Sequence, residues 1–141
     1  MGTIKLDENS LRNMMTFQSL TRVDVYDIAE DEENIIFVIY PGTLRKAIVN
    51  NGENVKKVQE KLGKKIIIVE YSPDIKRFVY NLFYRFGVKE IEINEIEGSY
   101  SIAVKVDPAQ KARAIGKEGR NLRLTKEILK RHFNVSNLVV K

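Results

Sequence analysis

The chain has no cysteine and only one histidine among its 141 residues. Without cysteine, disulfide bonds and thiolate metal sites are excluded. His132 falls on the apolar side of an expected helix, so we expect it to pack there rather than act as a base. The sequence also has no nucleophile elbow, no Walker-type loop and no His/Cys ligand pair. We therefore expect no enzymatic activity, no cofactor and no metal.

Long apolar segments are also missing. No run approaches the roughly 18 apolar residues that a membrane-spanning helix needs. The start MGTIKLDENS is too polar for a signal peptide, and Leu6 stands where a myristoylation motif has Ser or Thr. With 43% hydrophobic and 30% charged residues, the composition is that of a folded globular chain. We expect a soluble cytoplasmic protein without a membrane partner.

Positive charge is scarce in the first half and abundant in the second. Residues 1–71 hold 10 Lys/Arg against 11 Asp/Glu, whereas residues 72–141 hold 14 against 8. Residues 105–131 alone hold nine basic and three acidic residues. A cationic surface confined to one stretch suggests a polyanionic partner. The alternative is a charged face that only aids solubility.

The two halves resemble each other at a shift of 67 residues. The matched pairs are Pro41 and Pro108, Ala47 and Ala114, Ile48 and Ile115, Gly52 and Gly119, and Asn54 and Asn121. Each half predicts helix, strand, strand, helix, turn, helix and strand. The expected helices cover 7–20, 42–49 and 54–62, then 73–86, 108–115 and 120–133. The expected strands cover 23–29, 34–40 and 66–71, then 90–96, 99–106 and 137–141.

No linker separates the halves, because Tyr71 ends one and Ser72 is the expected N-cap of the next helix. Units of about seventy residues have marginal cores when alone. We therefore expect the two to pack rigidly. Tyr80 and Tyr84 lie off the apolar stripe of their helix; we expect them at the interface between units, with base stacking as the alternative.

The corner AIGKEGRNL carries the clearest functional signal. Gly116 suits the end of a helix, as a corner glycine would. Gly119 opens the next helix, where the absence of a side chain would let an anion reach free N–H groups. Lys117 lies in the turn, and Arg120 and Arg123 follow on the next helix. The pattern indicates a phosphate-binding corner.

Strand, helix, Gly-x-x-Gly, helix and strand, repeated twice, resembles the type II KH domain, whose loop clamps single-stranded nucleic acid. IGKEGRNLRL, preceded by VDPAQKARA, is similar to the second KH domain of the NusA family, and the short chain resembles archaeal NusA proteins. Bacterial NusA proteins add a polymerase-binding domain and an oligonucleotide-binding barrel, for which this sequence shows no counterpart.

The resemblance implies an α+β fold (an α/β sandwich) of two tandem type II KH domains, over residues 1–71 and 72–141. Each would have a three-stranded mixed sheet with three helices on one face. The implied RNA-binding residues are Ile115, Gly116, Lys117, Glu118, Gly119, Arg120 and Arg123.

The first half departs from the loop motif. It has valine where the first glycine belongs and no basic residue in the loop, although asparagine tolerates a left-handed backbone. We expect a degenerate, weaker RNA site at Val49, Asn50, Asn51 and Gly52.

The leading hypothesis is a single-stranded RNA-binding factor of transcription elongation or termination. Its partners would be RNA and RNA polymerase or a transcription complex, with a monomer favoured. One alternative is an RNA-binding protein of the ribosome or its assembly. A second is a protein-interaction scaffold whose KH units do not bind RNA.

Overall fold

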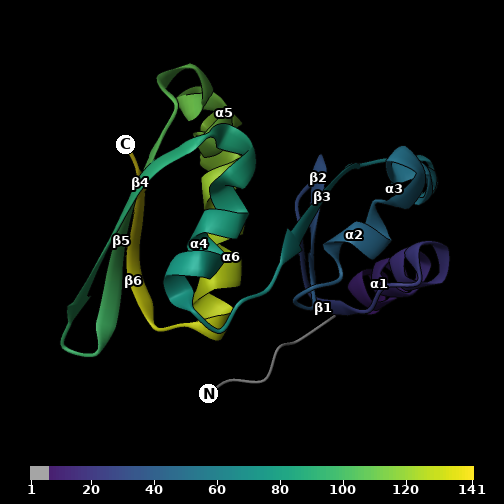
Figure 1. The fold of residues 1–141 in the computed structure, drawn as a ribbon, viewed down its shortest axis with the longest axis horizontal. Helices are drawn as coiled ribbons and strands as arrows, with labels where there is room; N and C mark the ends of the chain where they lie inside the picture. Colours follow the sequence, from purple (N-terminus) through teal and green to yellow (C-terminus); the bar gives the residue numbers. More distant parts are fainter. Residues whose placement is uncertain (1–6) are drawn as a thin grey trace. The chain divides into compact units, whose positions relative to one another are not determined.

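The computed structural model describes residues 7–141, and the chain divides into two compact units with the boundary between Ser72 and Pro73. In each unit the helices lie on one face of a three-stranded sheet (Figure 1). Within the described residues, no helix is both long and apolar enough to cross a membrane.

The first unit begins with a helix and ends with a strand. Its elements are α1 (Glu8–Thr21), β1 (Val25–Glu30), β2 (Asn34–Ile39), α2 (Leu44–Ala47), α3 (Val49–Leu62) and β3 (Lys65–Glu70). The sequence predicts this order. However, α2 is shorter than the helix expected over 42–49, because the chain leaves helical geometry before the three left-handed residues 50–52.

Short polar residues and glycine set the ends of these helices. The Asp7 carboxylate accepts a hydrogen bond of 2.7 Å from the Ser10 N–H and so caps α1. Gly63 ends α3 in the left-handed conformation, with φ +67°, as the sequence predicts.

The second unit repeats the order, with short 3₁₀ segments (η) at its corners. Its elements are α4 (Ile75–Phe83), η1 (Tyr84–Phe86), β4 (Val88–Ile96), β5 (Ser99–Val106), η2 (Pro108–Gln110), α5 (Lys111–Ile115), η3 (Lys117–Gly119), α6 (Arg120–His132) and β6 (Val135–Val140). The helix expected over 108–115 therefore starts as a 3₁₀ turn, which the Asp107 carboxylate caps.

One predicted helix start is wrong. Ser72 is not the N-cap of α4; the cap is Asp74, whose carboxylate accepts a hydrogen bond of 3.2 Å from the Lys76 N–H. Asp74 directly precedes Ile75, so its side chain reaches the free N–H groups of the first turn, whereas Ser72 lies two residues too early.

Both sheets are mixed and have the same topology. The central strand, β2 or β5, pairs antiparallel with the strand before it and parallel with the strand after the helices. The parallel connection carries two helices over one face, and the corner between those helices contains the Gly-x-x-Gly segment in the second unit. The prediction of an α+β fold with mixed three-stranded sheets is confirmed.

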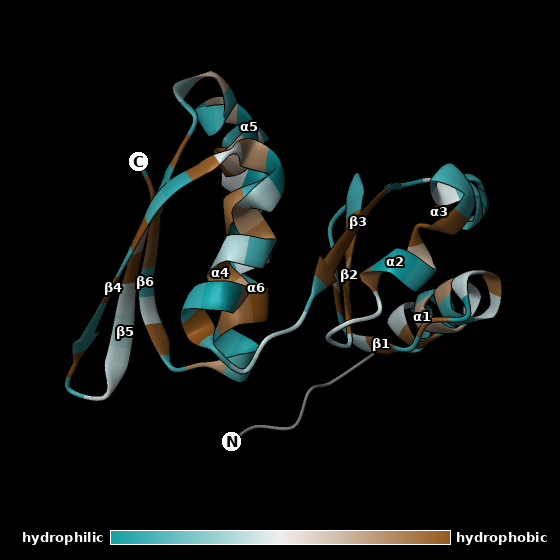
Figure 2. Cartoon of the chain, in the orientation of Figure 1, coloured by the Kyte–Doolittle hydropathy of each residue, from teal (hydrophilic) through white to brown (hydrophobic). Residues whose placement is uncertain are grey.

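The two sheets differ in how apolar they are. All five residues from Ile35 to Ile39 in β2 are buried, so that strand is apolar on both faces. In contrast, β4 alternates exposed polar with partly buried apolar residues. Figure 2 shows the same difference, with hydrophobic colour along β2 and β3 and mixed colours along β4. The central strand of the first unit is therefore buried from Ile35 to Ile39, whereas β5 is buried only at alternate positions toward its end.

The core of the second unit holds α4 and α6 against the sheet. Its fully buried side chains include Phe78, Leu82, Phe83, Ile102, Ile128 and Leu129. On α6 the buried side includes Leu124, Thr125, Ile128 and Leu129. This packing fixes the start of α6, and thereby the position of the loop before it.

Candidate nucleic-acid interface

The GKEG segment forms the corner between α5 and α6. α5 ends at Ile115, Gly116 leaves the helix, and residues 117–119 form a tight turn, with Glu118 and Gly119 left-handed, that leads into α6. Lys117 and Glu118 are exposed, whereas Gly116 and Gly119 are partly covered. The structure thus brings together all seven residues that the sequence predicts for this site.

Gly116 is required by a close approach of two backbone segments. Its φ of +81° with ψ of 164° lies in a region that only glycine enters readily. A Cβ atom at this position would lie 2.7 Å from the Asn121 backbone nitrogen, well inside contact distance. Gly116 therefore does more than end α5, because it lets the start of α6 fold back against the loop.

Gly119 has a different environment. Its φ is +72°, and the nearest atom to an added Cβ would be Nη1 of Arg123, at 3.4 Å. Glu118 beside it is also left-handed, with φ +56°. Two successive left-handed residues turn the chain sharply into α6, so at Gly119 the conformation, rather than close packing, favours glycine.

Two of the backbone N–H groups that could face an anion already donate hydrogen bonds within the loop. The Gly119 N–H donates to the Gly116 carbonyl at 3.0 Å, and the Arg120 N–H donates to the Lys117 carbonyl. Binding of an anion at this corner would therefore rely more on the basic side chains, and less on the backbone N–H groups, than the sequence predicts.

Three basic side chains surround the corner. Lys117 is exposed in the turn, and Arg120 lies 3.7 Å from the Glu118 carboxylate. Arg123 donates from Nη1 to the Glu118 carbonyl and so braces the left-handed turn. Glu118 consequently orients one arginine through its side chain and another through its backbone.

The two ends of the loop, at Ala114 and Asn121, form its neck. This neck is closed by the Asn121 side chain, which the sequence did not predict as part of the site. Asn121 is 8% exposed, and its amide nitrogen donates to the Ala114 carbonyl at 2.8 Å. The Asn121 amide oxygen accepts a hydrogen bond of 2.9 Å from Arg85 Nη2. Arg85 also donates from Nη1 to the Leu82 carbonyl at 3.2 Å, so it ties η1 to the base of the loop.

Arg85 is held mainly by neutral groups. Its guanidinium lies 4.3 Å from the Phe86 ring centroid, and its hydrogen-bond acceptors are an amide and a carbonyl oxygen. Arg85 is exposed as a residue, but partial desolvation of its guanidinium beside Phe86, with a smaller repulsion from Arg113, lowers the pKa of Arg85 to about 10. It still carries its charge at neutral pH.

The corresponding corner of the first unit has a different backbone. Asn50, Asn51 and Gly52 are all left-handed, with φ of +55°, +58° and +71°. Val49 stays out of that region, as expected for a β-branched residue. The turn therefore forms without a first glycine, but it bears no basic side chain.

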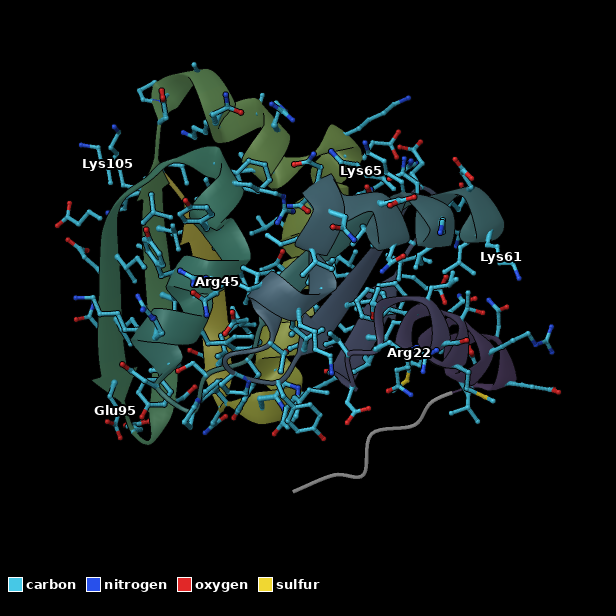
Figure 3. All side chains as sticks on the ribbon, turned by 45° about the vertical axis from the view of Figure 1, so that its right-hand side comes forward. Arg22, Arg45, Lys61, Lys65, Glu95 and Lys105 are labelled. Atoms are coloured by element: carbon cyan, nitrogen blue, oxygen red, sulfur yellow. The ribbon has the colours of Figure 1, made fainter. Side chains whose placement is uncertain are left out.

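The two ends of the β4–β5 hairpin differ in charge. The β4–β5 hairpin ends in Glu95 and Glu97, and in Figure 3 Glu95 lies near that tip, at the opposite end of the hairpin from Lys105. Lys105 is close to the end of β5 that leads to α5. The hairpin tip therefore carries two acidic side chains, whereas Lys105, at the other end, lies opposite Glu90.

Three other groups of residues could have formed a functional site: the acidic loop at Asp31, His132, and the pair Tyr80 and Tyr84. Asp31 accepts hydrogen bonds from the Glu33 and Asn34 N–H groups, as in a hairpin loop, and residues 7–141 contain no cluster of three or more potential metal ligands. The His132 ring lies 6.2 Å from the Phe78 ring, consistent with packing. The ring centroids of Tyr80 and Tyr84 lie 5.8 Å apart. The expectation that these two residues lie at the interface between units stays a prediction.

Comparison with known proteins identifies the family. A protein of Thermoplasma acidophilum named probable transcription termination protein NusA is 33% identical over 141 residues, which covers 100% of this chain and 98% of its own. A protein of the same name from Methanococcus vannielii is 33% identical over 137 residues, covering 97% of this chain and 79% of its own. The chain belongs to the NusA family.

Two further similarities agree with membership in the NusA family. Residues 75–139 match the family described as the NusA-like second KH domain, a range that contains Arg85, the GKEG corner and Asn121. The crystal structure of APE1850 is similar with a TM-score of 0.75 and 34% identity, covering 96% of this chain and 100% of its own. The predicted resemblance of the second unit to the NusA KH domain is thereby confirmed.

Proposed function

We propose that this NusA protein is a transcription elongation and termination factor that binds single-stranded RNA at the GKEG corner. The relatives are named for transcription termination, and KH domains hold about four nucleotides at this type of loop. The observation that carries the proposal is the basic corner of exposed Lys117 and Arg123 and partly buried Arg120, set on a backbone that only Gly116 permits.

The family assignment bears on the alternatives. The names of the relatives favour a role in transcription over one in ribosome assembly, and the basic corner argues against a scaffold that does not bind RNA. We propose that RNA polymerase or a transcription complex is the further partner, and that the protein acts in the cytoplasm as a non-enzymatic factor.

The first unit is proposed to be a second type II KH domain with a weaker loop. Its strand order and its paired helices match those of the second unit. Its loop at Val49, Asn50, Asn51 and Gly52 has an equally sharp turn but no lysine or arginine. It would therefore contribute less to the binding of phosphate groups.

The proposal is tested by changing both central residues of the loop, Lys117→Asp and Glu118→Asp. Aspartate tolerates the left-handed backbone at position 118 and keeps a negative charge beside Arg120. Both glycines remain, so the free energy of unfolding should change by less than about 1 kcal/mol. Affinity for a single-stranded RNA oligonucleotide should fall more than about tenfold, because phosphate meets like charge.

The matched control makes the same change in the first unit, Asn50→Asp and Asn51→Asp. Both residues are left-handed and exposed, whereas in the second-unit pair only Glu118 is left-handed; aspartate tolerates this conformation at all three positions. Affinity should fall less than in the second-unit variant. If the second-unit variant folds normally and binds RNA like the parent protein, the corner is only a structural turn and the proposal is wrong.

A further inference from the structure

We propose that Arg85 and Asn121 are positioning residues that set the GKEG loop for RNA binding, an inference that rests on the function proposed above. Arg85 comes from the segment before the sheet, and Asn121 from the first turn of α6, 36 residues later. Neither belongs to the Gly-x-x-Gly motif itself. Together they join η1, α5 and α6 at the neck of the loop.

The hydrogen-bond chain is continuous. Arg85 donates to the Asn121 oxygen at 2.9 Å, which leaves the Asn121 nitrogen directed at the Ala114 carbonyl, 2.8 Å away. Arg85 thereby fixes which end of the amide points at α5, because a guanidinium can only donate. The bond to Ala114 spans seven residues and closes the segment that contains both glycines.

The first unit has the matching asparagine and alanine but no arginine at the position of Arg85. Asn54 and Ala47 match Asn121 and Ala114 at the shift of 67 residues, so the asparagine and its acceptor are both present. Gln18 stands at the position that matches Arg85, and its side chain accepts from the Val25 N–H instead. Among the described residues, the Asn54 side chain forms no hydrogen bond.

The same comparison explains the first glycine. In the second unit the closed neck brings the Asn121 backbone so near that a Cβ at position 116 would lie 2.7 Å away. In the first unit, without the bond between Asn54 and Ala47, valine occupies the matching position 49. A tight neck and a glycine thus occur together, and an open neck occurs with a β-branched residue.

Geometry favours positioning over direct contact with RNA. Asn121 is 8% exposed, and both of its amide atoms have protein partners. Both terminal nitrogens of Arg85 donate to protein oxygens, and the guanidinium lies over the Phe86 ring. Arg85 and Lys117 are both exposed, but a phosphate at Arg85 would have to displace these contacts.

The test uses the full chain with Arg85→Met, Asn121→Ala and the double variant. Two controls match them closely. Arg77→Met removes an arginine from α4 that lies 5.9 Å from the Tyr80 ring centroid, and Asn54→Ala removes the unbonded counterpart of Asn121. Three quantities are measured: affinity for a single-stranded RNA oligonucleotide over a range of salt, amide hydrogen exchange of residues 115–119 without RNA, and thermal unfolding.

We expect Arg85→Met and Asn121→Ala each to lower RNA affinity by about three- to tenfold and to speed amide exchange in the loop. The double variant should be little worse than the worse single variant, because both break one chain of bonds. The dependence of affinity on salt should keep its slope, since no phosphate contact is lost. The two control variants should bind like the parent protein.

Three results would overturn the inference. A salt slope reduced by about 0.7 in Arg85→Met would make Arg85 a direct phosphate ligand. Unchanged RNA affinity and loop exchange, with only a lower unfolding temperature, would make the pair merely structural. Additive losses of RNA affinity in the double variant would show that Arg85 and Asn121 act independently. If Asn121→Ala does not fold, Arg85→Met decides alone.

The outcome is distinct from that of the proposed function. If the parent protein does not bind single-stranded RNA at all, the proposed function fails. Hydrogen exchange of residues 115–119 then still shows whether Arg85 and Asn121 order the loop.

Discussion

Gly116 and Gly119 occupy one motif but meet different physical demands. At Gly116 the backbone of Asn121 excludes any Cβ, and the ψ of 164° lies outside the left-handed helical region. At Gly119 the conformation is left-handed, and only the end of the flexible Arg123 side chain is near. The first glycine is thus determined by packing and the second by conformation.

Substitution by alanine should separate the two demands. Gly119→Ala should cost about 1–2 kcal/mol in the free energy of unfolding, the usual cost of a left-handed residue with a side chain. Gly116→Ala should cost roughly 3 kcal/mol, because strain adds to a clash that only backbone movement can relieve. Urea unfolding of both variants measures the difference, and equal costs would contradict the close approach at Asn121.

At the scale of elements, the candidate site depends on how α5 and α6 meet at their shared corner. Each of the two helices alone is an ordinary amphipathic segment, with Ala114 buried on α5 and Leu124 and Ile128 buried on α6. The basic residues fall on what remains exposed at their shared corner. The sheet contributes indirectly, because the parallel connection between β5 and β6 places both helices on the same face.

Helix α1 provides an element-scale prediction about pH. A hydrogen bond from the Ser10 backbone N–H lowers the pKa of Asp7 below its ordinary value of 3.8. The cap therefore stabilises α1 fully above that value, and its contribution is lost as the pH falls through the lowered pKa. The protection factor of the Ser10 amide, which is its intrinsic exchange rate divided by the observed rate at the same pH, should fall on acidification in the parent protein.

The Asp7→Asn variant supplies the control. Asparagine caps helices about as well as aspartate but does not titrate in this range. The protection factor of the Ser10 amide should then stay constant on acidification. If the parent protein and Asp7→Asn show the same pH dependence, the cap is not the cause.

At the scale of the whole molecule, the connection between the units is very short. Tyr71 is still bonded to the first sheet, its N–H donating to the Ile39 carbonyl at 2.8 Å, and Asp74 already caps α4. Only Ser72 and Pro73 lie between these two anchored residues. Flexible tethering of domains needs a longer segment.

We therefore predict that the two units tumble together in solution. Rotational correlation times from ¹⁵N relaxation should agree between amides before and after the boundary at Ser72 and Pro73. Separate correlation times for the two sets would show independent motion. Inserting a Gly-Ser segment of about ten residues between Ser72 and Pro73 provides the reference for two uncoupled units.

Much of the fold was determined by the sequence itself. Alternating apolar residues, glycine at helix ends and the repeat at 67 residues are local signals, so they predicted the order of elements in both halves. The left-handed turn of the first unit was also predictable, because asparagine and glycine follow Val49 there. The GKEG corner and its basic residues could be selected for the same reason, since they are contiguous.

What only the tertiary structure decided involves residues distant in the chain. Arg85 meets Asn121 across 36 positions, so no local pattern marks either as part of the loop. The need for glycine at position 116 arises from the nearness of the α6 backbone, which the packing of Leu124 and Ile128 against the sheet sets. Short-range periodicity records which residues prefer a helix or strand, whereas the neck of the loop depends on how three separate segments pack together.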